Sequence, residues 1–205
     1  DDPSKLVIHL SNIENLDRKA ETTPNEVTIF SPYYKTDEYG LSVMEHEITH
    51  LNMFRYVYPE SLILIEGVAE FYGDRVCRRI EGYPICYESY EYGTGRIREE
   101  ISPVTALDYF MSDLLNSQNK KAPYQYGTSF VTFLYETCGE QRVDTFISNA
   151  YRDSTISKDD VVSILQSEFG HDLFEKFAAW YKTNSDRFKY KDITSDDLVI
   201  STELR

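Results

Sequence analysis

The sequence predicts an α+β fold, in which a small N-terminal β-sheet precedes a mostly α-helical C-terminal part. Short runs rich in β-branched residues, bounded by Pro, Asn and Ser, occur in the first 40 residues. Beyond residue 40, apolar residues recur every three or four positions, which is the spacing of amphipathic helices. Strands are therefore expected at residues 6–10 and 27–30, and the segment 12–20 between them is interpreted as a short helix.

The helices expected after the strands span residues 41–56, 60–79, 104–115, 124–137, 141–151, 161–169 and 172–188. Pro59 separates the first two of them, and Gly139 is placed to end the fourth. Residues 83–101 mix Tyr and Gly with charged residues and have no regular period, which indicates a long loop. We expect an N-terminal α/β subdomain at residues 1–82 and a helical subdomain at residues 83–205, packed as one unit.

Charge, apolar runs and cysteine spacing limit the classes of partner and of site that this protein can have. The 205 residues include 21 Lys plus Arg and 35 Asp plus Glu, a net charge of −14 that argues against nucleic acid as a partner. No apolar run is long enough for a transmembrane segment. Cys77, Cys86 and Cys138 form no C-x-x-C pair, so a thiolate metal site is not expected. The sequence leaves two alternatives for the cysteines, a disulfide between Cys77 and Cys86 or three reduced thiols. We expect an extracytoplasmic protein from which any leader or anchor has been removed.

The segment from His46 to His50 reads H-E-x-x-H within the helix expected at residues 41–56. Residues four apart lie on the same helix face, so the two imidazoles can bind one zinc ion. Glu47 between them can take a proton from a water molecule at the metal. The alternative is a helix with two ordinary histidines, but a random chain of this length contains the motif in roughly 1% of cases.

A second segment, Glu66 to Glu70, reads E-G-V-A-E. A catalytic zinc site keeps three protein ligands and one open position. Because Pro59 marks a reversal of the chain, the next helix would return antiparallel and bring Glu66 beside the histidines. Glu70 faces the same way and can accept the other ring N–H of a ligating histidine. A solvated acidic face is the alternative, but the residues around both glutamates are mostly apolar.

The combination of H-E-x-x-H and E-G-x-A-E resembles the gluzincin zinc metallopeptidases, in particular their peptidase MA-like branch. The resemblance implies His46, His50 and Glu66 as zinc ligands and Glu47 as the general base. It further implies zinc-dependent hydrolysis of a peptide or protein substrate by a catalytic unit that both subdomains form. A propeptide or an inhibitor is a further partner that the sequence leaves open.

The resemblance continues at residues 124–127, which read Y-Q-Y-G and are similar to the Y-x-x-G segment that opens a helix in gluzincin aminopeptidases. In those enzymes the tyrosine hydroxyl hydrogen-bonds the oxyanion of the tetrahedral intermediate. The resemblance implies this role for Tyr124. Tyr126 is the competing candidate, and for either residue the alternative is an aromatic side chain packed in the core.

One part of the family pattern is absent. Gluzincin aminopeptidases carry G-x-M-E-N before the zinc helix, where the glutamate binds the substrate amine, and residues 1–45 contain no such segment. An endopeptidase is therefore favoured over an aminopeptidase. Residues 27–30 are expected to form an edge strand that pairs with the substrate backbone. For residues 83–101, a lid over the cleft and an ordinary surface loop are both open.

Two other classes of function stay open. The first is a metallopeptidase fold that binds without turnover, or one that a partner restrains. The second is a structural zinc site, but such sites usually close four ligands and favour cysteine, and the motif has no cysteine near it.

Overall fold

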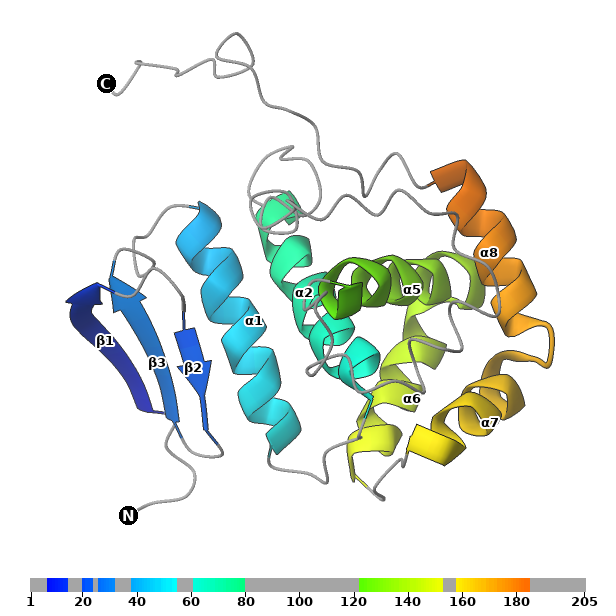
Figure 1. Cartoon of the computed structure of the whole chain (residues 1–205), viewed down its shortest axis with the longest axis horizontal. Coiled ribbons are helices and arrows are strands. Elements are labelled where there is room, and N and C mark those ends of the chain that lie inside the picture. The colour runs from blue at the N-terminus through cyan, green and yellow to red at the C-terminus, as the bar shows by residue number, and fades with distance from the viewer. Residues whose placement is uncertain are drawn as a thin grey trace, which may run out of the picture.

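The structure is a computed structural model of the chain, and it describes residues 7–14, 20–23, 26–31, 38–54, 61–79, 122–152 and 158–184. Within these ranges it contains a three-stranded sheet and six helices (Figure 1), consistent with the α+β prediction. The helix expected at 104–115 and the loop expected at 83–101 lie outside the described residues. Among the described helices, none combines the length and the apolar character that crossing a bilayer requires.

The sheet consists of β1 (Val7–Glu14), β2 (Ala20–Thr22) and β3 (Glu26–Ser31) in the order β1-β3-β2. β3 pairs in parallel with β1 and antiparallel with β2. The helix predicted for residues 12–20 is wrong at both ends, because residues 12–14 extend β1 and residue 20 begins β2.

The predicted substrate-binding edge at residues 27–30 is also wrong. These residues belong to β3, the middle strand, whose two hydrogen-bonding sides are used by β1 and β2. A middle strand has no side left to pair with a substrate.

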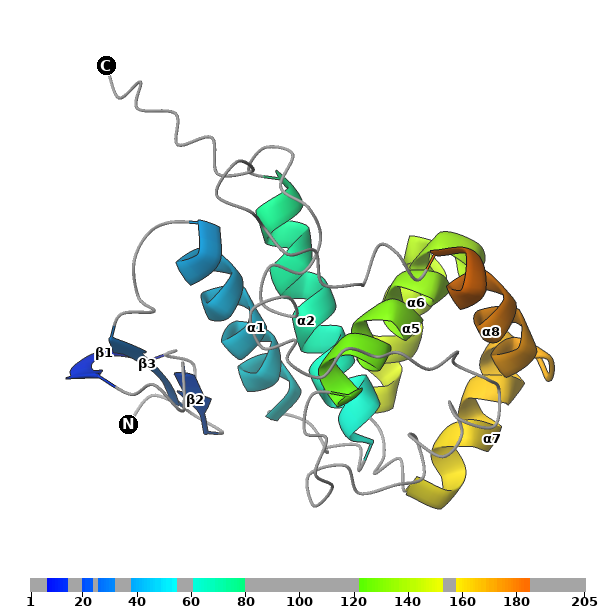
Figure 2. The ribbon, with the colours of Figure 1, turned by 45° about the horizontal axis from the view of Figure 1, so that its top comes forward.

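The helices follow the sheet as α1 (Glu38–Phe54), α2 (Leu62–Arg79), α5 (Ala122–Cys138), α6 (Glu140–Arg152), α7 (Lys158–Phe169) and α8 (Leu173–Asn184). Figures 1 and 2 show α1 between the sheet and α2, with α5 to α8 on the other side of α2. Gly139 and Gly170 end α5 and α7 with φ of 87° and 115°, a left-handed conformation that glycine adopts without strain.

Apolar clusters hold these layers together. Val27 and Ile29 of β3 pack against Leu51 of α1, which fixes α1 on the sheet. Val68 of α2 packs against Val131 of α5. The largest cluster joins α5 to α8 and includes Leu64 of α2, Tyr126, Phe130, Phe133, Leu134, Val143, Phe146, Val161, Leu165, Phe169, Leu173, Phe174, Phe177 and Tyr181. The interface between α1 and α2 therefore lies between two apolar regions, and polar side chains meet there.

Candidate metal site

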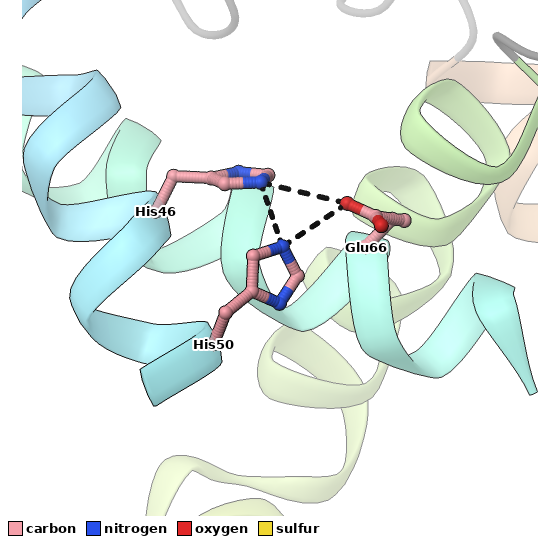
Figure 3. A group of neighbouring side chains, drawn as sticks. All are labelled: His46, His50 and Glu66. Atoms are coloured by element: carbon pink, nitrogen blue, oxygen red, sulfur yellow. Dashed lines mark hydrogen bonds and ion pairs between the residues drawn. The ribbon is translucent and has the colours of Figure 1, made fainter. Parts of the chain in front are cut away.

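Two neighbouring helices supply the side chains predicted to bind metal. α1 carries His46 and His50 one turn apart, and both rings point toward α2 (Figure 3). Ser61 caps the start of α2, because its hydroxyl accepts a hydrogen bond from the Leu64 N–H at 3.4 Å. This start places Glu66 in the second turn of α2, opposite the two histidines.

The three predicted ligand atoms form a compact triangle (Figure 3). The His50 Nε2 atom lies 2.9 Å from the His46 Nε2 atom and 3.2 Å from the Glu66 Oε2 atom. The third side, between His46 Nε2 and Glu66 Oε2, measures 3.5 Å. The structure thus brings together the His46, His50 and Glu66 side chains that the sequence predicts as a ligand set.

The triangle has the dimensions that a zinc ion requires. Zn²⁺ binds imidazole nitrogen and carboxylate oxygen at about 2.0–2.2 Å, so neighbouring ligand atoms of a tetrahedral site lie about 3.3 Å apart. The measured separations of 2.9, 3.2 and 3.5 Å bracket that value. Three ligands leave a fourth position for water or substrate, which distinguishes a catalytic zinc site from a closed structural one.

The ligand set is also largely withdrawn from solvent. His46 and His50 are 8% and 7% exposed, and the Glu66 side chain is 17% exposed. Burial of imidazoles and a carboxylate costs free energy unless they are paired or coordinate a metal. A metal ion bound to all three would offset this cost, which favours a binding site over an accidental cluster.

Glu70 lies behind His46, as expected for a residue that orients a ligand. Its Oε1 atom is 3.4 Å from the His46 Nδ1 atom, and Glu70 is only 6% exposed. A carboxylate on Nδ1 fixes the ring tautomer so that Nε2 faces the metal position. This contact supports the predicted role of Glu70.

The carboxylates perturb the titration of His46. Burial by itself lowers the pKa of His46, but the hydrogen bond to Glu66 and the negative charge of Glu70 outweigh it. The net effect raises the pKa of His46 to about 10. Burial by itself raises the pKa of Glu66, but its hydrogen bonds to both histidines hold this pKa below its usual range. The metal-free site therefore contains a protonated His46 and an ionised Glu66 at neutral pH.

This protonation state predicts that zinc binding releases protons. A ligating imidazole must be neutral, so at pH 7 the His46 ring must lose its proton, whereas Glu66 has none to lose. We expect zinc binding at pH 7 to release a proton from His46, and the apparent zinc affinity to rise with pH as His46 loses this proton more readily. Titration calorimetry in buffers of different ionisation enthalpy measures the proton count. Zinc binding with no dependence on the buffer would contradict this protonation state.

Glu47 lies on the next face of α1, toward the sheet. Its side chain is half-buried, and its Oε2 atom accepts a hydrogen bond from the Thr22 hydroxyl of β2. The predicted base directly follows the ligand candidate His46 on α1, and its negative charge contributes to raising the pKa of His46. Sequence reasoning missed Thr22, because 25 residues separate it from Glu47 and no local pattern links them.

A close backbone contact fixes α2 against α5 next to the ligand Glu66. A Cβ atom added to Gly67 would lie 2.4 Å from the carbonyl carbon and 2.5 Å from the Cα atom of Gly127. Only glycine permits this approach. The contact brings the first two turns of α5, which include residues 124–127, beside the start of α2.

The two tyrosine candidates for the oxyanion donor are both in α5. Tyr124 lies in its first turn, and the position of its side chain is outside the described structure. Tyr126 is 3% exposed and belongs to the large core cluster, with its ring 6.0 Å from that of Tyr181.

The disulfide that the sequence allows between Cys77 and Cys86 stays a prediction, because Cys86 lies outside the described residues.

A polar network secures the far side of α2. Asp144 of α6 accepts hydrogen bonds from the hydroxyls of Tyr72, at 3.0 Å, and Tyr135. The two hydroxyls are also 2.9 Å apart. Burial and the Asp144 carboxylate raise the pKa of Tyr135, so both tyrosines stay neutral donors. The network ties α2, α5 and α6 together and steadies the helix that carries Glu66.

Comparison of the chain with protein-family models, with curated proteins and with solved structures gives no match. The candidate site consequently stands on its own geometry, and its chemistry is the basis for a functional assignment.

Proposed function

We propose that this chain is a zinc-dependent peptide hydrolase, and more specifically an endopeptidase of the gluzincin type. The observation that carries the proposal is the ligand triangle of His46, His50 and Glu66, with sides of 2.9 to 3.5 Å. Glu47 follows His46 on α1, and its charge acts on the His46 ring. Two imidazoles, one carboxylate and a neighbouring glutamate are the donor set of a hydrolytic zinc site. The spacing H-E-x-x-H supports the same assignment.

Each residue has a defined task in the proposed reaction. His46, His50 and Glu66 would hold a zinc ion, which would supply Lewis acidity toward the scissile carbonyl and the attacking water. Glu47 accepts a proton from that water as its oxygen adds to the carbonyl carbon. Glu47 then gives that proton to the amide nitrogen and the C–N bond breaks. The second proton of the water passes from the new carboxylic acid to the amine, so a carboxylate and an ammonium group leave.

Two further residues serve this reaction in the proposal. Glu70 keeps His46 oriented through the contact of 3.4 Å to Nδ1. Tyr124 donates a hydrogen bond to the oxyanion, a contribution that is typically about 2–4 kcal/mol. The core packing of Tyr126 favours Tyr124 over it for this role.

Hydrolysis of a mixed peptide library tests the proposal. We expect the zinc-loaded protein to cleave internal bonds, to lose activity with a chelator and to regain it with added zinc. Peptides with acetylated N-termini separate the two peptidase classes, because an endopeptidase cleaves them and an aminopeptidase does not. A zinc-loaded protein that cleaves no peptide of either library would overturn the proposal and favour a binding protein.

A further inference from the structure

We propose that Thr22 is a positioning residue for the general base, because its hydroxyl holds one carboxylate oxygen of Glu47 at the edge of the sheet. This inference rests on the proposed hydrolytic function. It adds a residue of β2 to a site that the sequence motifs confine to the helices. Thr22 acts through Glu47 and touches no reacting atom itself.

The register of the sheet puts the Thr22 side chain on the face that packs against α1. Thr22 pairs with Val27 at the end of β2, and alternation in a strand puts Thr22 on the same face as Ala20. Ala20 packs with the cluster that joins the sheet to α1 through Leu51. Thr22 therefore faces α1.

Glu47 meets Thr22 because of its own position on α1. It follows Met44 by three residues and precedes Leu51 by four, and both of those side chains pack against the sheet. Residues at this spacing share one helix face. Glu47 is thus on the margin between the sheet face of α1 and the face that carries His46 and His50.

The hydrogen bond selects a single arrangement of the Glu47 carboxylate. The Thr22 hydroxyl has one proton and two acceptors within reach, the Glu47 Oε2 atom and, at 3.4 Å, the Glu47 carbonyl oxygen. The carboxylate is the closer and stronger acceptor because it is charged. With Oε2 held by Thr22, Oε1 is the oxygen that exchanges a proton with water. Such pre-orientation matters because small displacements of a catalytic group cost large factors in rate.

Substitution of the hydroxyl tests this role in turnover. Thr22→Val keeps the shape of the side chain and removes the donor, and we expect kcat to fall about tenfold with KM unchanged. Thr22→Ser keeps the donor and is expected to restore most of the rate. Thr23→Val is the matched control, since Thr23 is exposed and its hydroxyl lies 3.4 Å from the Glu26 carbonyl oxygen. The substrate for all variants is one internally quenched peptide that the wild-type protein cleaves.

Unfolding in urea tests the contact independently of activity. In a double-mutant cycle, Thr22→Val should lower the unfolding midpoint in the wild-type background and much less in a Glu47→Ala background, because the shared hydrogen bond is already gone. Equal shifts in both backgrounds would overturn the inference. So would an unchanged kcat in Thr22→Val. A wild-type protein that cleaves no peptide refutes the proposed function instead, which keeps the two failures distinguishable.

Discussion

The substitution Glu47→Gln is expected to lower kcat for peptide cleavage by about 10²- to 10⁴-fold, the range typical for loss of a general base. Glutamine has nearly the same shape as glutamate but accepts no proton from water at neutral pH. Because Glu47 is not one of the three ligand side chains, zinc binding should be retained. Steady-state kinetics on a quenched peptide, together with the zinc content of the same sample, measures both effects.

Glu45→Gln is the matched control for that experiment. Glu45 is half-buried on α1 two residues earlier and lies outside the ligand triangle, so its neutralisation should leave kcat within about twofold of wild type. Full activity in Glu47→Gln would contradict the proposed mechanism. An equal loss in both variants would trace the effect to the overall charge of α1.

The second large effect is expected from Gly67→Ala, through packing rather than chemistry. The added Cβ atom would stand 2.4 to 2.7 Å from backbone atoms of Gly127, which cannot rotate away as a side chain can. α2 and α5 must therefore separate, and we expect a destabilisation of about 1–3 kcal/mol. Because Gly67 adjoins Glu66, zinc affinity should fall as well. Urea denaturation and a competitive zinc chelator measure the two quantities.

A substitution at a second glycine separates the loss of stability from the loss of zinc affinity. Gly139 is constrained by its backbone conformation, with φ of 87°, whereas its Cβ position is open. Gly139→Ala should cost roughly 1–2 kcal/mol from backbone strain and leave zinc affinity unchanged, since it lies at the far end of α5. Wild-type stability in Gly67→Ala would contradict the close contact of α2 with α5.

The grouping of His46, His50 and Glu66 could be predicted from the sequence because most of the rules behind it are local. Four-residue spacing puts His46 and His50 on one face, and Glu66 and Glu70 on another, wherever the helices lie. The meeting of Glu66 with the two histidines depends in addition on α2 running antiparallel to α1, and Pro59 indicates the turn between these helices. The glycine that ends α5, Gly139, and the helical spacing of the apolar residues in α5 to α8 are local signals of the same kind.

Strand order and long-range contacts could not be predicted this way. β2 spans three residues without a hydrophobic alternation, so the sequence predicts no strand there, and the helix expected at residues 12–20 includes only Ala20 of β2. Without β2, the sequence predicts that residues 27–30 form an edge strand, whereas these residues lie in the middle of the sheet. The contact of Thr22 with Glu47 depends on how α1 crosses the sheet, and no spacing in the chain encodes it.

Zinc K-edge X-ray absorption of the purified, zinc-loaded chain tests the central claim most directly. We expect about one zinc per chain, with nitrogen and oxygen neighbours at about 2.0–2.2 Å, the scattering pattern of two imidazole rings and no sulfur. The His50→Ala variant should lose one ring from that pattern and bind zinc more weakly. A protein that binds no zinc, or a zinc shell with sulfur at about 2.3 Å, would contradict a site built from His46, His50 and Glu66.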